Sequence, residues 1–136
     1  MITPSGKVNL GDTAEMSAYL IDCVTTPEDT ALTADHLRRC SRDLAFWNQQ
    51  YALAIRDLLM AEQACKKIKG TVYGQLKASG PKVTDKTAEA GTTAHPAYVQ
   101  AQQKVFDSEA VKTQISGVCD AIRIKHKSLD ALIRKE

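Results

Sequence analysis

The sequence predicts an all-α fold: a long antiparallel helical hairpin with a short N-terminal helix, assembling into a helical oligomer. Aromatic residues make up only 5% of the 136 residues, and runs of β-branched residues are scarce, which disfavours sheet. Small and apolar side chains recur with a seven-residue period over about five heptads. No proline or glycine occurs between Arg38 and Lys69, so this repeat is expected on one continuous helix.

The first long helix is predicted over residues 33–78. Thr33 is a suitable N-cap, and Thr26 followed by Pro27 predicts a preceding turn. The two core positions of each heptad hold small, aromatic and aliphatic residues, which favours packing against several neighbours over a long two-stranded zipper. These core residues are Leu37, Cys40, Leu44, Trp47, Tyr51, Ala54, Leu58, Ala61, Cys65, Ile68 and Val72.

The second long helix is predicted over residues 95–134 and is expected to run back along the first. Thr93 is expected to cap it, and Pro96 suits its first turn. Its apolar residues are Val105, Phe106, Val111, Ile115, Val118, Ile122, Leu129 and Leu132.

Two regions are expected along the chain. Residues 1–32 form an acidic N-terminal arm with an amphipathic helix over 13–24, and residues 33–136 form the helical hairpin domain. Small and polar residues predict an irregular linker at about 79–95, in which residues 84–89 suit a short helical turn.

Apolar side chains on several sides of both long helices predict self-association. Trp47 and Ile55 lie on different sides of the first helix, and Val105 and Phe106 on different sides of the second. A single hairpin would leave some of them uncovered. The alternative is a three-helix monomer closed by the N-terminal helix.

The charge is unevenly distributed along the chain. Residues 1–36 hold one base and six acids, whereas residues 37–136 hold 17 bases and 10 acids, which gives net charges of −5 and +7. A basic body is compatible with binding nucleic acid, and the acidic arm would contact a protein or shield the basic face. An ordinary solvated surface is the alternative.

The stretch CKKIKGTVYGQLK, residues 65–77, carries the strongest functional signal. At 100° per residue, Lys66, Lys69, Tyr73 and Lys77 share an arc of about 80°. Lysines follow a phosphate backbone, an aromatic ring stacks on an unpaired base, and Gly70 and Gly74 would permit close approach. The alternative is a frayed helix end, where glycine and lysine are also favoured.

Further basic residues complete the set of nucleic-acid-binding candidates. Lys67 and Lys82 lie in or next to the same stretch, and Arg123 and Lys125 belong to a C-terminal basic cluster with Lys127, Arg134 and Lys135. An antiparallel hairpin would bring that cluster near the start of the first long helix.

No enzyme, metal or cofactor is expected. His36 and Cys40 could supply two metal ligands, but no third or fourth follows, and no phosphate-binding loop or catalytic constellation is recognisable. The four cysteines lack CxxC spacing and are expected to be reduced and mostly buried. Without a membrane span or a signal peptide, the protein is expected in the cytoplasm.

The second half of the chain resembles small phage recombination mediators of the UvsY type over about residues 44–133. The matching elements are Val83, Thr84 and Glu89, then Pro96 and Tyr98, then Ala121, Ile122, Lys125 and Leu129. The resemblance implies a helical oligomer that binds single-stranded DNA and helps a recombinase replace single-strand-binding protein. It also implies DNA contacts at Lys66, Lys67, Lys69 and Lys77. The long acidic arm and the cysteine content depart from the family pattern.

The leading functional hypothesis is therefore a non-enzymatic single-stranded DNA-binding recombination mediator, in the host cytoplasm if phage-encoded. The alternative is a phage-encoded helical protein that binds and inhibits or redirects a host protein. A purely structural helical adaptor is a third reading.

Overall fold

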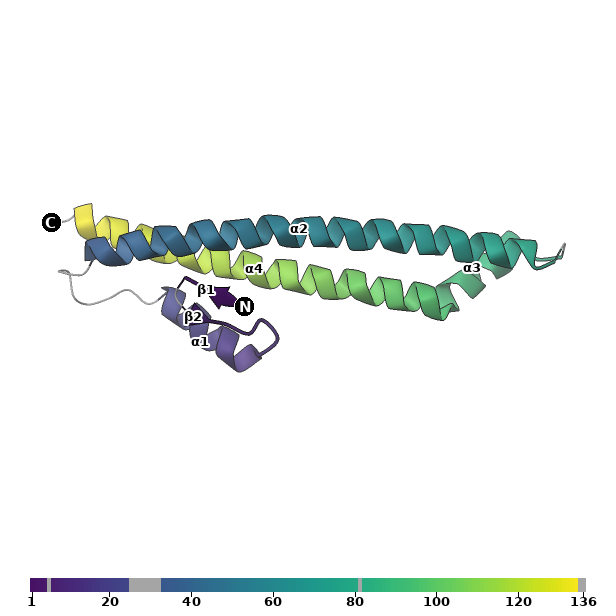
Figure 1. The fold of residues 1–136 in the computed structure, drawn as a ribbon, viewed down its shortest axis with the longest axis horizontal. Coiled ribbons are helices and arrows are strands. Elements are labelled where there is room, and N and C mark those ends of the chain that lie inside the picture. The colour runs from purple at the N-terminus through teal and green to yellow at the C-terminus, as the bar shows by residue number, and fades with distance from the viewer. Residues whose placement is uncertain (5, 25–32, 81, 135–136) are drawn as a thin grey trace. The chain divides into compact units, whose positions relative to one another are not determined.

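A computed structural model describes residues 1–4, 6–24, 33–80 and 82–134. The turn expected at Thr26 and Pro27 lies outside these residues. The fold is mostly helical, as predicted, and contains a pair of long helices that pack together (Figure 1). The described elements are β1 (Ile2–Thr3), β2 (Gly6–Lys7), α1 (Thr13–Val24), α2 (Thr33–Ala78), α3 (Asp85–Ala94) and α4 (Pro96–Arg134).

The chain forms two compact units, and both long helices contribute to each. Unit 1 consists of Met1–Leu53 and Val111–Glu136, and unit 2 consists of Ala54–Ala110. Unit 1 therefore holds β1, β2, α1, the first part of α2 and the last part of α4. Unit 2 holds the remainder of α2, all of α3 and the start of α4.

The heptad pattern predicted for α2 is confirmed by burial. All eleven predicted core positions are buried or half-buried, and Cys40, Trp47, Ala54, Leu58 and Val72 are the most deeply buried. The pattern in α4 is confirmed less completely. Its central apolar residues are buried, but Val111 and Phe106 are exposed.

Two residue pairs at the start of the chain form an antiparallel ladder that the sequence pattern did not predict. Ile2 pairs with Lys7, and Thr3 pairs with Gly6. Gly6 has a φ of 132°, a conformation that favours glycine because it has no Cβ. The Thr3 hydroxyl donates to the Gly6 carbonyl at 2.6 Å and strengthens this short pairing.

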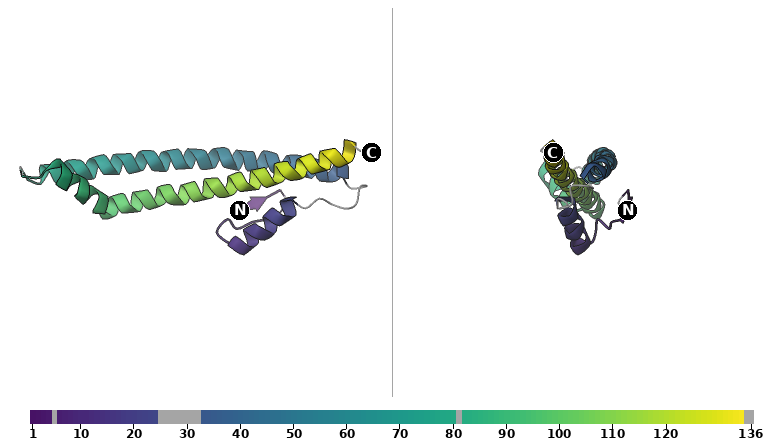
Figure 2. Two further views of the ribbon diagram at one scale, coloured as in Figure 1. Left: turned by 180° about the vertical axis from the view of Figure 1, so that it is seen from behind. Right: turned by 90° about the vertical axis from the view of Figure 1, so that its left-hand side faces the viewer.

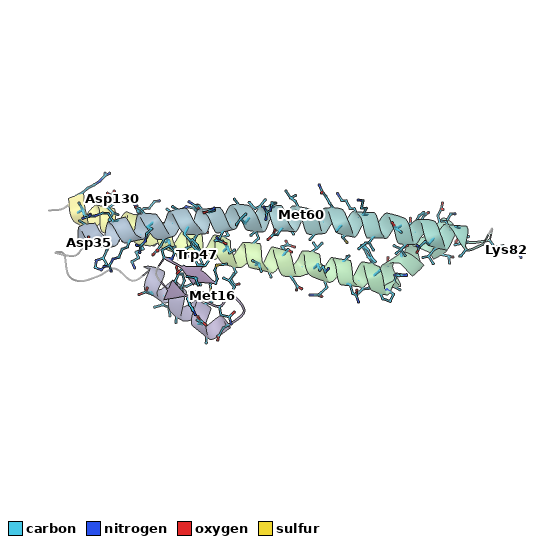
Figure 3. All side chains as sticks on the ribbon, in the orientation of Figure 1. Met16, Asp35, Trp47, Met60, Lys82 and Asp130 are labelled. Atoms are coloured by element: carbon cyan, nitrogen blue, oxygen red, sulfur yellow. The ribbon has the colours of Figure 1, made fainter. Side chains whose placement is uncertain are left out.

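Trp47 is the centre of the unit 1 core. Its side chain is 0% exposed, and its ring lies edge-on to Phe46 and tilted against Tyr19 of α1. The indole Nε1–H donates to the Tyr19 hydroxyl at 2.8 Å, so the buried polar group is satisfied. Met16, also buried, projects from the same short helix (Figure 3).

The N-terminal segment is held on the helix pair of unit 1 by side-chain donors that bind its backbone carbonyls. Gln114 binds the Leu10 carbonyl at 2.7 Å, and Lys125 binds the Asp22 carbonyl at 3.1 Å. A weaker contact of 3.4 Å joins Arg42 to the Pro4 carbonyl. Figure 2 presents α1 beside the helix pair from two further directions. Because this segment covers Trp47, that residue no longer supports the expectation of self-association.

Where α2 meets α4 in unit 1, the antiparallel arrangement brings together residues far apart in the sequence. The Cys40 thiol donates to the Ile122 carbonyl at 3.4 Å, and Arg123 donates to the Asn48 amide oxygen at 3.2 Å. Cys40 and Cys119 are buried, Cys65 is half-buried, and all three are free thiols. The side chain of Cys23 lies outside the described part of the chain.

The Tyr19–Trp47 contact provides a test of how α1 is held. Tyr19→Phe removes the acceptor for a buried indole N–H, so we expect a loss of about 1–3 kcal/mol in the free energy of unfolding. Chemical denaturation followed by Trp47 fluorescence measures it. Tyr98→Phe is the matched control, because the one contact of the Tyr98 hydroxyl among the described residues is with Gln102, at 3.4 Å. Equal stability losses in the two variants would contradict this account of the core.

Candidate nucleic-acid interface

The candidate interface begins with a run of residues, from the last part of α2 to the start of α3, that has no negative charge. Between Glu62 and Asp85 the sequence contains five lysines and no carboxylate. Helix α2 continues through both Gly70 and Gly74 to Ala78. The alternative of a frayed helix end required the glycines to end the helix, and they do not.

Four lysines of this run are available to an external anion. They are exposed and form no ion pair with any residue that the structure describes: Lys66, Lys67, Lys69 and Lys82. Their charges have no partner within unit 2 that an anionic ligand would first have to displace. We refer to Lys66, Lys67 and Lys69 as the α2 lysines.

The two glycines lie on the outer surface of α2. At about 100° per residue, both fall within roughly 20° of the direction opposite the buried Val72. A Cβ added to either would meet nothing within 4 Å, so packing inside this chain does not require glycine at these positions. Each nevertheless costs the helix about 1 kcal/mol relative to alanine.

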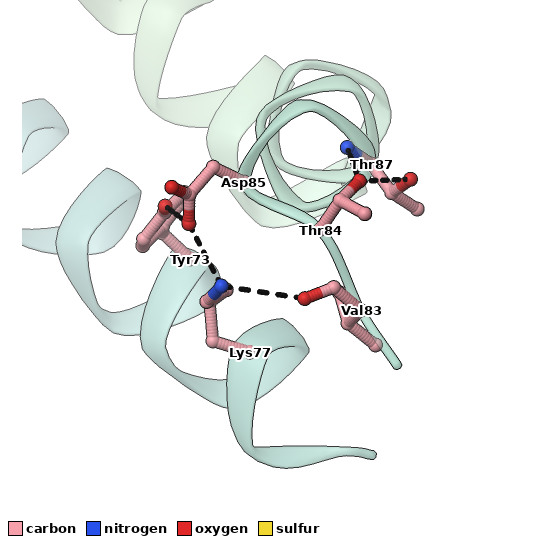
Figure 4. Close-up of polar contacts among 6 residues, drawn as sticks. All are labelled: Tyr73, Lys77, Val83, Thr84, Asp85 and Thr87. Carbon is pink, nitrogen blue, oxygen red and sulfur yellow. Dashed lines mark hydrogen bonds and ion pairs between the residues drawn. The ribbon is translucent and has the colours of Figure 1, made fainter. Parts of the chain in front are cut away.

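Tyr73 and Lys77, two further candidates, are engaged with the start of α3 (Figure 4). The Tyr73 hydroxyl donates to Asp85 Oδ1 at 2.9 Å, and Lys77 Nζ lies 2.7 Å from the same oxygen. Lys77 also donates to the Val83 carbonyl at 3.3 Å. These contacts, which we call the Asp85 junction, join the end of α2 to the residues that follow it.

The geometry of the Asp85 junction follows from local helix chemistry. Thr84 is the N-cap of α3 and accepts a hydrogen bond from the Thr87 backbone N–H, so Asp85 begins the helix. A carboxylate in the first turn is also favoured by the helix dipole. Close packing fixes α3 further along, where a Cβ at Gly91 would lie 2.9 Å from Leu76 Cδ1.

The three ionisable groups of the junction shift one another's pKa values. Hydrogen bonds from Lys77 and then Tyr73 lower the pKa of Asp85 below its ordinary 3.8. The bond to Asp85 raises the pKa of both Tyr73 and Lys77. The charged carboxylate, the neutral phenol and the ammonium thus stabilise one another at neutral pH.

The region expected to be an irregular linker is more ordered than predicted. It contains α3, a ten-residue helix, instead of a short turn. The prediction that Thr93 caps α4 is wrong, because Thr93 lies within α3 and its hydroxyl donates to the Glu89 carbonyl. His95 caps α4 instead: its carbonyl accepts from the Val99 N–H, and its Nδ1 accepts from the Ala97 N–H at 3.1 Å.

The remaining candidates, Arg123 and Lys125, belong to unit 1 and have partners there. Arg123 forms an ion pair with Asp120 at 3.0 Å and also binds Asn48. Lys125 donates to the Asp22 carbonyl in the N-terminal segment. Arg134, from the same C-terminal cluster, pairs with Asp130, and Lys135 lies outside the described residues.

No group of three or more histidine, cysteine or carboxylate side chains is arranged to hold a metal ion in the described part of the chain. Burial raises the pKa of the Cys40 and Cys119 thiols, which disfavours the nucleophilic thiolate. Within the described ranges, none of the helices has a stretch apolar and long enough to cross a bilayer.

Comparison of the chain with protein-family models, with curated protein sequences and with solved structures found no match.

The Asp85 junction predicts a specific pH dependence of stability. Since folding depresses the Asp85 pKa, its contribution is present above the unfolded-state value near 3.8 and is lost as the pH falls through the lower folded-state value. We expect Asp85→Asn to be less stable than the native protein at pH 7, with the difference shrinking at strongly acidic pH. Thermal unfolding of both proteins across this range measures it.

Asp107→Asn is the matched control for this experiment, because Asp107 is exposed on α4 and, within the described ranges, is hydrogen-bonded to Gln103 alone. Its stability difference from the native protein should change little between the two pH values. If Asp85→Asn behaves like Asp107→Asn, the junction contributes nothing measurable to folding.

Proposed function

We propose that this chain is a non-enzymatic protein that binds single-stranded DNA through the α2 lysines. The observation that carries the proposal is a lysine-rich, carboxylate-free stretch of helix whose α2 lysines are exposed and form no ion pair with any described residue. From Lys66 to Lys77 the helix extends about 16 Å, enough for several contacts along a phosphate backbone. Lys82 lies beyond the end of α2 and is a further exposed lysine of unit 2.

The contact of Tyr73 with Asp85 is compatible with stacking of its ring on a base. Its hydrogen bond to Asp85 uses the hydroxyl, whereas stacking on a base would use the ring face. Lys77 would have to share its charge between Asp85 and a phosphate, so we assign it a smaller part in binding than the α2 lysines.

We further propose a biological role as a phage recombination mediator of the UvsY type, acting in the host cytoplasm with a recombinase and single-strand-binding protein. The support is the resemblance of residues 44–133 together with the exposed lysines. Self-association belongs to the same proposal. Large exposed apolar side chains in unit 2 favour it, namely Leu59, Met60, Val99 and Phe106.

The same apolar side chains also favour the alternative, a helical protein that binds and inhibits or redirects a host protein. The two functions make different demands on the lysines. A DNA-binding mediator needs the α2 lysines and loses affinity with added salt, whereas a partner bound through apolar contacts does not depend on them.

Charge reversal of the α2 lysines tests the proposal. We expect Lys66→Glu/Lys69→Glu to weaken binding to single-stranded oligonucleotides of every sequence. The salt dependence should flatten by about 1.4 in logarithmic slope, since each lost phosphate contact removes about 0.7 for a single strand. A fluorescence titration at several salt concentrations measures both quantities.

The control for this experiment is Lys7→Glu/Lys104→Glu, which makes the same change in net charge at exposed lysines outside the α2 surface. It should lower affinity far less. Equal effects of the two double variants would attribute binding to overall charge and defeat the proposed site.

The glycines provide an independent test. Gly70→Ala and Gly74→Ala should each stabilise the protein by about 0.5–1 kcal/mol, because alanine favours the helix and its methyl group meets no neighbour. If a strand lies on this surface, the same substitutions should weaken its binding. Gly117→Ala is the control, since Gly117 is an equally open glycine of α4 and should change stability alone. Unchanged DNA affinity in all three variants would exclude close approach at the glycines.

A further inference from the structure

Unit 2 contains a pocket beside the α2 lysines that the proposed function has not used. It has a volume of about 340 Å³ and lies between α2 and the residues that join α3 to α4. This volume is at the small end of the range for ligand sites in proteins. The pocket is therefore suited to one small group, not to a large molecule or a helix.

The pocket has an apolar lining. Ile68, Val72 and Ala97 contribute hydrocarbon surface from α2 and from the first turn of α4. Val72 is buried, and the other two are half-buried, so this surface belongs to the packed part of the unit. A flat, weakly polar ring is a group that gains by leaving water for such a surface.

Four other lining residues supply polar groups without a negative charge. Lys67 offers an ammonium group, and Gln75 offers both an amide donor and an acceptor. The Thr71 hydroxyl donates to the Lys67 carbonyl at 3.0 Å, which leaves its oxygen as an acceptor. No carboxylate lines the pocket.

The capping role of His95 fixes its hydrogen-bonding capacity. Its Nδ1 accepts from the Ala97 N–H, so in the neutral imidazole the proton is on Nε2, which is then a donor. Nε2 has no hydrogen-bond partner in the part of the chain that the structure describes. His95 thus presents one donor in a position held by the start of α4.

We propose that this pocket receives one unpaired base of the single strand whose phosphates lie along the α2 lysines. Lys67 joins the two sites, because it belongs to the exposed lysines and also lines the pocket. The combination of apolar surface, mixed donors and acceptors and a flanking cation matches a nucleobase attached to its phosphate. This inference rests on the proposed function and adds a contact to the base itself.

A base explains the lining better than a bare anion. Inorganic phosphate would use Lys67 and His95 but would leave apolar surface against a charged group, which is unfavourable. An aliphatic side chain would use the apolar surface but would leave the amide of Gln75 and the imidazole of His95 without a partner. Only a ring with polar edges satisfies both kinds of lining.

The test compares oligothymidylate with an abasic strand of the same length, measured by fluorescence anisotropy with the full chain. Both strands carry the same phosphates, so their difference in affinity reports contacts to bases. We expect the native protein to prefer oligothymidylate by at least about fivefold. Ala97→Leu, which fills the pocket, should reduce this preference to the part that stacking on Tyr73 supplies and leave affinity for the abasic strand unchanged.

Two further variants separate pocket filling from other effects. Ala94→Leu makes the same substitution at an exposed position of α3 outside the lining and should retain the preference. Gln75→Ala removes a polar group from an exposed position of α2 and should reduce the preference even if Ala97→Leu disturbs folding. Circular dichroism confirms that each variant is folded.

The outcomes distinguish the inference from the function on which it rests. Failure of the native protein to bind either strand would overturn both. Equal affinity of the native protein for the two strands would overturn the pocket and leave phosphate binding intact. The base pocket would also be overturned if folded Ala97→Leu and Gln75→Ala both kept the full preference for oligothymidylate. A loss of affinity for the abasic strand in Ala97→Leu would overturn it as well.

Discussion

The structure depends on one constraint: α2 is a 46-residue helix whose apolar stripe must be covered along its whole length. A helix cannot bury its own stripe, and helical stability in proteins comes mainly from packing an amphipathic face. In unit 1 the cover consists of the last part of α4 and the N-terminal segment, which encloses Trp47. In unit 2 it consists of α3 and the start of α4, with Gly91 packed against Leu76. The elements that cover α2 thereby also determine which of its outer residues remain exposed.

The sequence predicts the periodic features of this fold well and the long-range contacts poorly. The heptad positions of α2 are recognisable because burial repeats with the geometry of the helix, and each position is decided by its own side chain. The partner of Tyr73 and Lys77 is not recognisable in the same way. Asp85 reaches them only because Thr84 caps α3 and Gly91 allows close packing, and both depend on the three-dimensional path of the linker.

The N-cap of α4 is a second feature that residue preferences alone did not predict. Thr93 is the better cap by residue preference, yet its hydroxyl is used within α3. Because α3 extends to Ala94, only His95 lies between the two helices, and its imidazole takes the capping role. An unpredicted helix thus displaced the expected cap. The same change brought an imidazole to the pocket beside Lys67, and no pattern in the sequence predicts that placement.

The two basic zones differ in a way that composition cannot reveal. In unit 1, Lys125 and Arg123 direct their hydrogen-bond donors to a backbone carbonyl, an amide oxygen and a carboxylate of the same chain. Any anion that binds there must replace contacts that already compensate the cost of ordering these long side chains. In unit 2, the α2 lysines have no such contacts among the described residues, so an anion gains their full interaction and releases counterions. Equal numbers of basic residues therefore do not make equal binding sites, and the exposed α2 lysines favour unit 2 over unit 1 as the site for an anionic polymer.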